Sequence, residues 1–219
     1  MPAPAPKTAP LDLERALWSA GHSAVYGIDE AGRGAWAGPV VAACVCLPPG
    51  EPDALYAALV GVNDSKQVDS ITRTRLALVV REHALCWGVG AASSAEIDQF
   101  GIVPANQQAM HRAYLAARAR HPAGACQHLL LDHVRWAWDN TPFTSMTKGD
   151  ARSLSIAAAS ILAKVHRDDL MIAFESQYPG YGFASHKGYG TAAHQDAITR
   201  LGPCPIHRMT FAPLRPHLL

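Results

Sequence analysis

The chain has 219 residues, of which 49% are hydrophobic and 17% are charged, and its formal net charge at pH 7 is +1. This composition allows a buried core and excludes a globally disordered chain. The near-zero charge excludes a bulk attraction to nucleic acid or to an anionic membrane, so any such binding must come from a local arrangement of residues.

Membrane insertion, secretion and disulfide bonding are not expected for this chain. Its longest apolar stretches, 40–47 and 156–163, are much shorter than the roughly 20 residues of a membrane helix. Residues 1–10 contain no apolar segment typical of a secretory signal. The five cysteines include no Cys-x-x-Cys pair, which argues against a disulfide framework and against a thiolate zinc site. We therefore expect a cytoplasmic protein.

The expected elements alternate between strands and helices along the chain. In order, they are a loose tail over 1–10, a helix from 11 to about 21, strands over 24–28 and 40–47 joined by a glycine-rich turn, a Pro-rich loop over 48–52, a helix over 71–84, a strand over 85–91, helices over 94–99 and 105–120, a strand over 127–132, a long helix over 151–174 and a short helix over 192–201. This order predicts an α/β or α+β protein whose sheet is covered by helices. Because no composition break divides the chain, we expect a single domain over 11–219, with a C-terminal appendage from about residue 178.

Two adjacent carboxylates, Asp29 and Glu30, follow the first apolar strand and precede the sequence Ala-Gly-Arg-Gly. Burying both would be costly without a cation, and Mg²⁺ and Mn²⁺ prefer such hard oxygen ligands. Adjacent strand residues point to opposite faces, so both can serve one ion only where the turn breaks the alternation. An ordinary acidic turn is an equally good interpretation of this pair alone.

Two further aspartates lie at the boundaries of expected elements. Asp132 closes a buried strand, where sheet proteins often place ligands, although a solvated strand end is an alternative. Asp150 precedes the long helix, and taken alone it favours an N-cap over a metal ligand. Asp168 and Asp169 lie deep in that helix and are expected to form surface ion pairs or structural contacts.

Basic and aromatic residues suggest contacts with a phosphate backbone. The candidate phosphate partners are Lys148, Arg152, Lys164, Arg167 and Lys187. Residues 184–219 also carry Arg200, Arg208 and Arg215 against the single acidic residue Asp196, which fits a nucleic-acid groove or a solvated basic face. Tyr189 lies between two glycines, so its ring either stacks on a sugar or base or anchors a loop in the core.

Five motifs in one order resemble those of the ribonuclease HII family, the bacterial type 2 ribonucleases H. They are YGIDEAGRGAWAGPVVAACV at 26–45, DSK at 64–66, KGDARSLSIAAASILAKVHRDDLM at 148–171, YPGYGFASHKGYGT at 178–191 and GPCPIHRMTF at 202–211. The similarity covers almost the whole chain from about residue 25 to 211. It implies a ribonuclease H-like fold, with a mixed central sheet flanked by helices.

The resemblance also implies a metal-dependent active site. Its four carboxylates would be Asp29, Glu30, Asp132 and Asp150, which would hold Mn²⁺ or Mg²⁺ ions and carry catalysis. The substrate would be bound by the Gly32-Arg33-Gly34 backbone, which recognises a ribonucleotide and its 2′-hydroxyl, by Lys66 on a phosphate and by Tyr189 on the adjacent deoxyribose. The implied enzyme hydrolyses the RNA strand of RNA–DNA hybrids and cuts duplex DNA on the 5′ side of an embedded ribonucleotide, leaving 3′-hydroxyl and 5′-phosphate ends.

The sequence departs from the family pattern at two places near this site. Ala35-Trp36 replaces the usual Pro-Leu after the GRG motif, and His133 replaces the usual Gly after the third aspartate. The family resemblance implies a monomer, and it leaves a replication clamp open as a partner; no membrane partner is expected, because the apolar stretches are short. The alternatives are a non-catalytic protein that binds hybrids on the same fold, and a metal-dependent hydrolase of small phosphorylated molecules.

Overall fold

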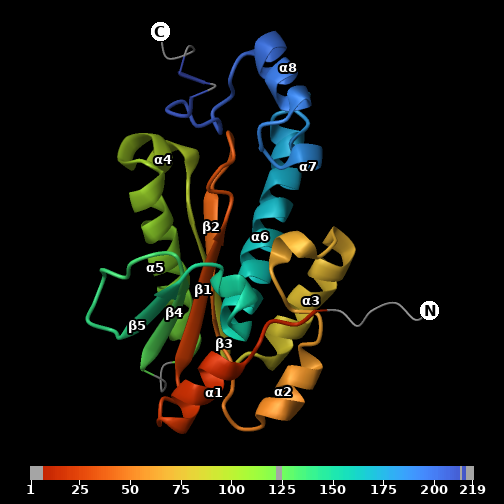
Figure 1. The fold of residues 1–219 in the computed structure, drawn as a ribbon. Coiled ribbons are helices and arrows are strands. Elements are labelled where there is room, and N and C mark those ends of the chain that lie inside the picture. Colours follow the sequence, from red (N-terminus) through yellow and green to blue (C-terminus); the bar gives the residue numbers. More distant parts are fainter. Residues whose placement is uncertain (1–6, 122–124, 213, 216–219) are drawn as a thin grey trace, which may run out of the picture.

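A five-stranded mixed sheet forms the centre of the computed structural model, which describes residues 7–121, 125–212 and 214–215 (Figure 1). The strands lie in the order β3-β2-β1-β4-β5, with antiparallel pairing among β1, β2 and β3 and parallel pairing of β4 with β1 and β5. Their bounds are β1 Val25–Ala31, β2 Val40–Cys46, β3 Cys86–Ala92, β4 His128–Asp132 and β5 Phe143–Met146. The expected mixed sheet flanked by helices is confirmed.

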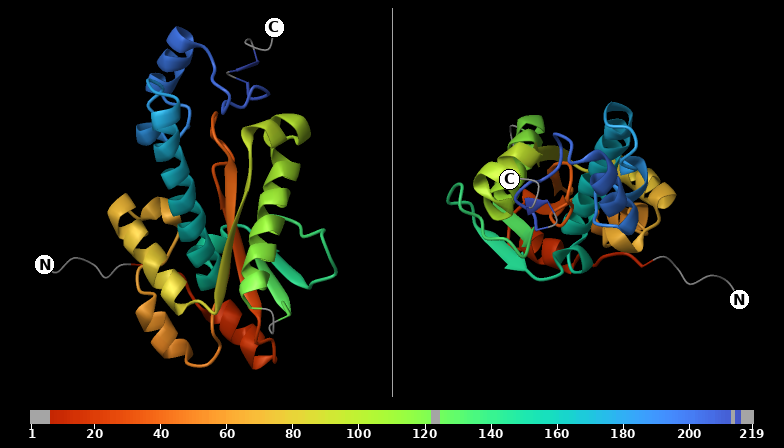
Figure 2. Two further views of the ribbon diagram at one scale, coloured as in Figure 1. Left: turned by 180° about the vertical axis from the view of Figure 1, so that it is seen from behind. Right: turned by 90° about the horizontal axis from the view of Figure 1, so that it is seen from above.

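Helices cover both faces of this sheet, as the view from behind in Figure 2 shows. One face is covered by α4 and α5, and the other by α3 and α6. The helices are α1 Asp12–Ser19, α2 Pro52–Ala58, α3 Ser70–His83, α4 Ser94–Phe100, α5 Ile102–Arg120, α6 Leu154–Gln177, α7 Phe183–His186 and α8 Ala192–Leu201, with single 3₁₀ turns η1 Ser65–Gln67 and η2 Gly149–Ala151. None of the helices formed by the described residues is long and apolar enough to cross a membrane.

Close packing of α6 on the sheet depends on one residue without a side chain. A Cβ on Gly27 of β1 would lie 2.3 Å from the Ser155 carbonyl carbon, so the first turn of α6 rests directly on the strand. On the other face, the side chains of Tyr26 and Ile28 pack with α5 residues such as Met110. The residues of β1 therefore alternate between the α5 face and the α6 face, as those of a regular strand do.

The C-terminal segment packs on the distal half of α6 and on the loop that joins β1 to β2. Phe183 of α7 and Ala197 of α8 form a small core with Ala37 and with Met171 of α6. A β-bridge joins Ala37 to His207. In Figure 1 this segment lies at the end of the molecule where β1 and β2 meet.

Several expected boundaries were wrong, each for a local reason. The long helix starts at Leu154, because the Ser153 hydroxyl accepts the Ile156 N–H and caps it, so Asp150 is not its N-cap. Residues 52–58 form α2, with Pro52 in its first turn, where the missing N–H costs no hydrogen bond. The short strand β5 and the single-turn helix α7 were not expected.

The expected loose tail over 1–10 was wrong for the residues of it that the structure describes. The Ala9 N–H donates to the Val62 carbonyl at 2.8 Å, and the Thr8 hydroxyl accepts the Gly61 N–H at 2.9 Å. Ala9 is buried in the main core. Residues 7–10 are therefore held against the segment before η1, while residues 1–6 lie outside the described residues.

Candidate active site

Carboxylate side chains gather where β1 and β4 end. Asp29 and Glu30 are the fifth and sixth residues of β1, and Asp132 is the last residue of the parallel neighbour β4. Asp150 lies in η2, immediately before α6. The Asp132 carboxylate accepts the Gly149 N–H at 2.9 Å, which ties the end of β4 to the turn that carries Asp150.

Asp29 and Glu30 point to opposite faces of the sheet. Ser160 of α6 lies near Asp29 and lowers its pKa, whereas Asn106 of α5 does the same for Glu30. The strand alternation therefore continues through both residues. Asn106 is a buried neighbour of the site that sequence reasoning missed, because no spacing linked it to Glu30.

The surroundings of these carboxylates disfavour their negative charge. Burial and the neighbouring charge of Glu30 raise the pKa of Asp29 well above its ordinary value. Burial also raises the pKa of Glu30, against the opposing charge of Arg33, whose guanidinium donates to Glu30 Oε1 at 3.2 Å. Burial and the carboxylates of Asp64 and Asp132 raise the pKa of Asp150.

Cations fit this donor set, although the side chains do not form a closed cage. Glu30 Oε2 is buried and has no hydrogen-bond partner among the described residues. Carboxylate oxygens are the ligands that divalent cations such as Mg²⁺ and Mn²⁺ prefer. In the described part of the chain, however, no three His, Cys, Asp or Glu side chains are close enough together to hold one ion.

Lys66 provides a positive charge at the same place. Partial burial lowers the pKa of Lys66, but the negative charges of Asp64, Asp29 and Asp150 outweigh it and raise this pKa above its ordinary value. Asp64 holds the turn in shape by accepting the Lys66 N–H at 2.9 Å. An open cleft of about 360 Å³ is lined by Asp64, Lys66, Gln67, Asp132, His133, Thr147, Lys148, Asp150 and Ala151.

Two backbone N–H groups in the loop after β1 are left without an acceptor among the described residues. The buried guanidinium of Arg208 donates to the carbonyls of Gly32 and Arg33, both at 2.8 Å. In the described chain, the N–H groups of Arg33 and Gly34 have no hydrogen-bond acceptor, and both residues are exposed. Gly32 has a φ of +93°, which favours glycine. The loop can therefore donate hydrogen bonds to an oxygen-rich ligand.

Arg167 was a candidate phosphate partner and Arg208 part of a basic C-terminal patch that fits a nucleic-acid groove or a solvated face, and the structure places neither at the surface. Both are fully buried. Arg167 donates to the carbonyls of Ala37, Pro39 and Lys187 at 2.9 to 3.1 Å. The two guanidinium groups thus join the loop after β1 to the C-terminal segment.

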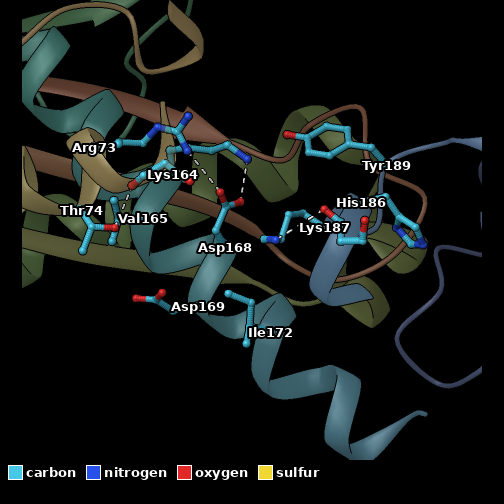
Figure 3. Close-up of a pocket in the computed structure, with 12 residues that line it drawn as sticks. Arg73, Thr74, Lys164, Val165, Asp168, Asp169, Ile172, His186, Lys187 and Tyr189 are labelled. Atoms are coloured by element: carbon cyan, nitrogen blue, oxygen red, sulfur yellow. Dashed lines mark hydrogen bonds and ion pairs between the residues drawn. The ribbon is translucent and has the colours of Figure 1, made fainter. Parts of the chain in front are cut away.

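Tyr189 lies between α7 and α8 at the rim of a second cavity of about 540 Å³ (Figure 3). Lys164 Nζ lies 5.4 Å from the centroid of its ring, and the Arg167 guanidinium carbon lies 5.2 Å from it. The side chain is half-buried, and it is near enough to Lys66 to affect the pKa of that residue. In the same cavity Asp168 pairs with Arg73 and Lys164, which confirms its expected structural contacts.

Two hydrogen-bonded histidines, His194 and His207, hold the Tyr189 backbone. His194 Nδ1 lies 3.0 Å from the Tyr189 carbonyl, which only accepts, so this nitrogen carries the proton. His194 Nε2 then accepts from His207 Nε2 at 3.0 Å, and His207 Nδ1 accepts the Cys204 N–H at 2.9 Å. Burial lowers the pKa of His194 to about 4, which keeps the ring neutral.

Comparison with known proteins identifies the family. The family model of ribonuclease HII matches residues 26–214. The chain belongs to the ribonuclease HII family. It is 46% identical over 215 residues to ribonuclease HII of Syntrophotalea carbinolica, covering 98% of each chain, and 48% identical over 212 residues to that of Chloroflexus aurantiacus, covering 95% of this chain and 96% of the other.

Solved structures share the fold. The ribonuclease H2 from Pyrococcus horikoshii OT3 superposes with a TM-score of 0.72 at 23% identity, covering 88% of this chain and 96% of that one. Bst-RNase HIII in complex with Mn²⁺ superposes with a TM-score of 0.71 at 20% identity, covering 90% of this chain and 70% of that one. Family membership makes the protein a divalent-metal-dependent endonuclease that hydrolyses RNA in RNA–DNA hybrids.

Proposed function

We propose that the protein also cuts duplex DNA on the 5′ side of an embedded ribonucleotide, and that Asp29, Glu30, Asp132 and Asp150 hold the Mn²⁺ or Mg²⁺ that this hydrolysis needs. The observation that carries the proposal is the position of the loop over Gly32–Gly34. Its free N–H groups lie directly after the strand that carries Asp29 and Glu30. A ribonucleotide bound by this loop would therefore present its phosphate to the carboxylates.

The protein's own groups divide the work of binding and positioning. The N–H groups of Arg33 and Gly34 donate to oxygens of the ribonucleotide, including the 2′-hydroxyl that DNA lacks. Tyr189 packs on the next sugar, and Lys66 neutralises a phosphate. A divalent cation bound by the carboxylates supplies the Lewis acidity that activates water and stabilises the charge of the leaving oxygen. Because burial and the charge of neighbouring carboxylates raise the pKa values of Asp29, Glu30 and Asp150, these three groups favour binding a cation over remaining unpaired anions.

A cleavage assay tests this proposal. A 5′-labelled DNA duplex with one ribonucleotide is incubated with Mg²⁺, with Mn²⁺ or with EDTA, and an all-DNA duplex serves as the control. We expect one metal-dependent cut 5′ to the ribonucleotide that leaves a 3′-hydroxyl, and no cut in the control. A retained gel shift without any cut would instead favour a non-catalytic protein that binds hybrids.

We propose a cytoplasmic monomer that acts on the duplex without a partner subunit. The described cysteines are all free thiols, as a reducing compartment favours. An Archaeoglobus fulgidus neighbour was solved as a complex of RNase HII with PCNA, at a TM-score of 0.67 and 22% identity. Light scattering of the protein alone would detect a homo-oligomer, and light scattering with a sliding clamp added would detect a complex with the clamp.

A further inference from the structure

Trp36 connects the loop after β1 to the loop that carries Tyr189. Its N–H donates to the Gly188 carbonyl at 2.8 Å, and its carbonyl accepts the Arg208 N–H at 2.8 Å. Its indole ring lies directly on Gly190, where a Cβ would be only 2.2 Å from Trp36 Cζ2. The residue immediately after Tyr189 therefore has its position set by this indole.

The same indole also contacts the residue that binds the Tyr189 carbonyl. The ring centroids of Trp36 and His194 are 5.5 Å apart, and His194 Nδ1 donates to the Tyr189 carbonyl at 3.0 Å. Trp36 thus reaches Tyr189 by two routes, through Gly190 and through His194. The half-buried Tyr189 ring itself faces Lys164 and Arg167 and is free to meet a ligand.

Gly190 is required here for space and not for backbone conformation. Its φ is outside the left-handed region, whereas Gly188 has a φ of +78°. Alanine could therefore adopt the Gly190 backbone, and the three atoms nearest to its methyl group would all belong to the indole. This separation makes the contact testable by compensating substitutions.

We infer that Trp36 and Gly190 form one positioning unit that fixes Tyr189 relative to the Gly32–Gly34 loop. The unit thereby sets the preference for an RNA-to-DNA junction over continuous RNA. In a junction the sugar that follows the ribonucleotide is a deoxyribose, which Tyr189 meets, so its position affects that substrate most. The inference rests on the proposed function. Trp36 touches no substrate in this scheme and acts as a positioning residue.

A double-mutant cycle tests the inference with Trp36→Leu, Gly190→Ala and the combined variant. The readout is the ratio of kcat/KM for a duplex with one ribonucleotide to kcat/KM for a continuous RNA–DNA hybrid. We expect Gly190→Ala to lower this ratio roughly tenfold or more, since a shift of about 1 Å in a positioning group has effects of that size. We expect Trp36→Leu to lower it only about threefold, and the combined variant to recover most of the loss, because contacting residues couple.

Two matched controls separate this effect from general destabilisation. Gly50→Ala adds a methyl group where nothing lies within 4 Å, and Trp87→Leu removes an indole from β3, whose register places it away from the carboxylates. Both controls should keep the wild-type ratio, whatever their unfolding midpoints. If Gly190→Ala does not fold, recovery of folding and of the ratio in the combined variant carries the test.

An unchanged ratio in folded Gly190→Ala would overturn the inference, as would a combined variant equal to the product of its single effects. A combined variant that remains unfolded would overturn it too, because the steric conflict should be relieved. Failure of the proposed function is distinguishable from these outcomes, since the wild-type protein would then leave the single-ribonucleotide duplex uncut.

Discussion

Two buried carboxylates contact the same helix, α6, in opposite surroundings. Glu14 of α1 is fully buried, and its Oε1 accepts from the Ser153 hydroxyl, the Ser155 hydroxyl and the Ser155 N–H at 2.5, 2.6 and 2.9 Å. Asp29 is almost as deeply buried, but the carboxylates of Glu30 and Asp132 lie near it and act against its charge.

The difference shows that burial alone does not determine what a carboxylate does. At the N-terminus of α6, hydroxyl and amide donors converge on Glu14 Oε1, where a helix N-terminus favours a carboxylate, so the group stabilises the fold, although Oε2 is buried without a partner among the described residues. At the end of β1, negative neighbours leave Asp29 short of compensating charge, which a bound cation would supply. Substitutions should therefore separate stability from activity at these two places.

The largest effect is expected for Asp150→Asn, which keeps the size of the side chain and removes its charge. Loss of a ligand in a metal-dependent site should lower kcat by roughly 1,000-fold or more, since the cation supplies most of the charge stabilisation in such hydrolysis. Relief of the repulsion from Asp64 and Asp132 should leave the unfolding midpoint equal to or above that of the wild type. Cleavage rates and thermal unfolding measured on one preparation check both parts, and unchanged turnover would remove Asp150 from the site.

Glu14→Ala should have the reverse pattern, with lost stability and retained activity per folded molecule. Removing the carboxylate leaves buried donors of Ser153 and Ser155 without an acceptor, which should cost about 4 kcal/mol of unfolding free energy. Glu14→Gln retains an acceptor oxygen and should cost about 1 kcal/mol. Denaturant titrations of both variants provide the measurement. Equal losses in the two variants would contradict the role given to the hydrogen bonds.

Strong apolar patterns made much of the fold predictable from the sequence. The long apolar runs of β1, β2 and α6 predict buried elements, whereas β5 has four residues, three of them exposed, and carries no such pattern. The Pro-rich start of α2 is typical of a loop as well as of a helix N-terminus.

The site was predictable where strand ends decide positions and less so elsewhere. Asp132 ends a buried strand, and the fold places it beside β1, as the pattern indicates. The buried state of Arg167 and Arg208 could not be predicted, because a basic residue that binds phosphates looks the same in sequence as one that binds carbonyls. The carbonyls that accept hydrogen bonds from these arginines are distant from them in the sequence, as Gly32 is from Arg208.

Acidification should weaken the region around Tyr189 through His194. Its folded pKa of about 4 lies below the ordinary value of 6.5, so the unfolded chain takes up the proton first as the pH falls. The stabilisation is complete above pH 6.5 and is lost progressively down to about pH 4, by about 3 kcal/mol in total. The groups that face the ring are His186, His207, Trp36 and Phe183.

Nuclear magnetic resonance titration of the His194 ring measures this pKa directly. The unfolding free energies of the wild type and of His194→Gln are then measured by denaturation across the same pH range. Subtracting one from the other cancels the contribution of the site carboxylates, which titrate in both proteins. This difference in unfolding free energy should change between pH 6.5 and 4 and stay constant above that range. A His194 ring that titrates near pH 6.5 would contradict its assignment as a buried, neutral imidazole.

The smallest effect is expected at His133, which adopts a φ of +48° immediately after Asp132. A left-handed conformation costs a non-glycine residue about 1 to 2 kcal/mol, and a glycine at this position removes that cost. Part of the gain, about 0.5 to 1 kcal/mol, is offset because glycine gives the unfolded chain more conformational entropy. His133→Gly should therefore raise the unfolding free energy by less than about 1 kcal/mol. His133→Ala removes the same exposed ring and its 3.4 Å contact with Thr147 but keeps the strain, so it should be less stable than His133→Gly. The reverse order in a denaturant titration would show that the ring, and not the backbone, determines stability at this position beside the carboxylates.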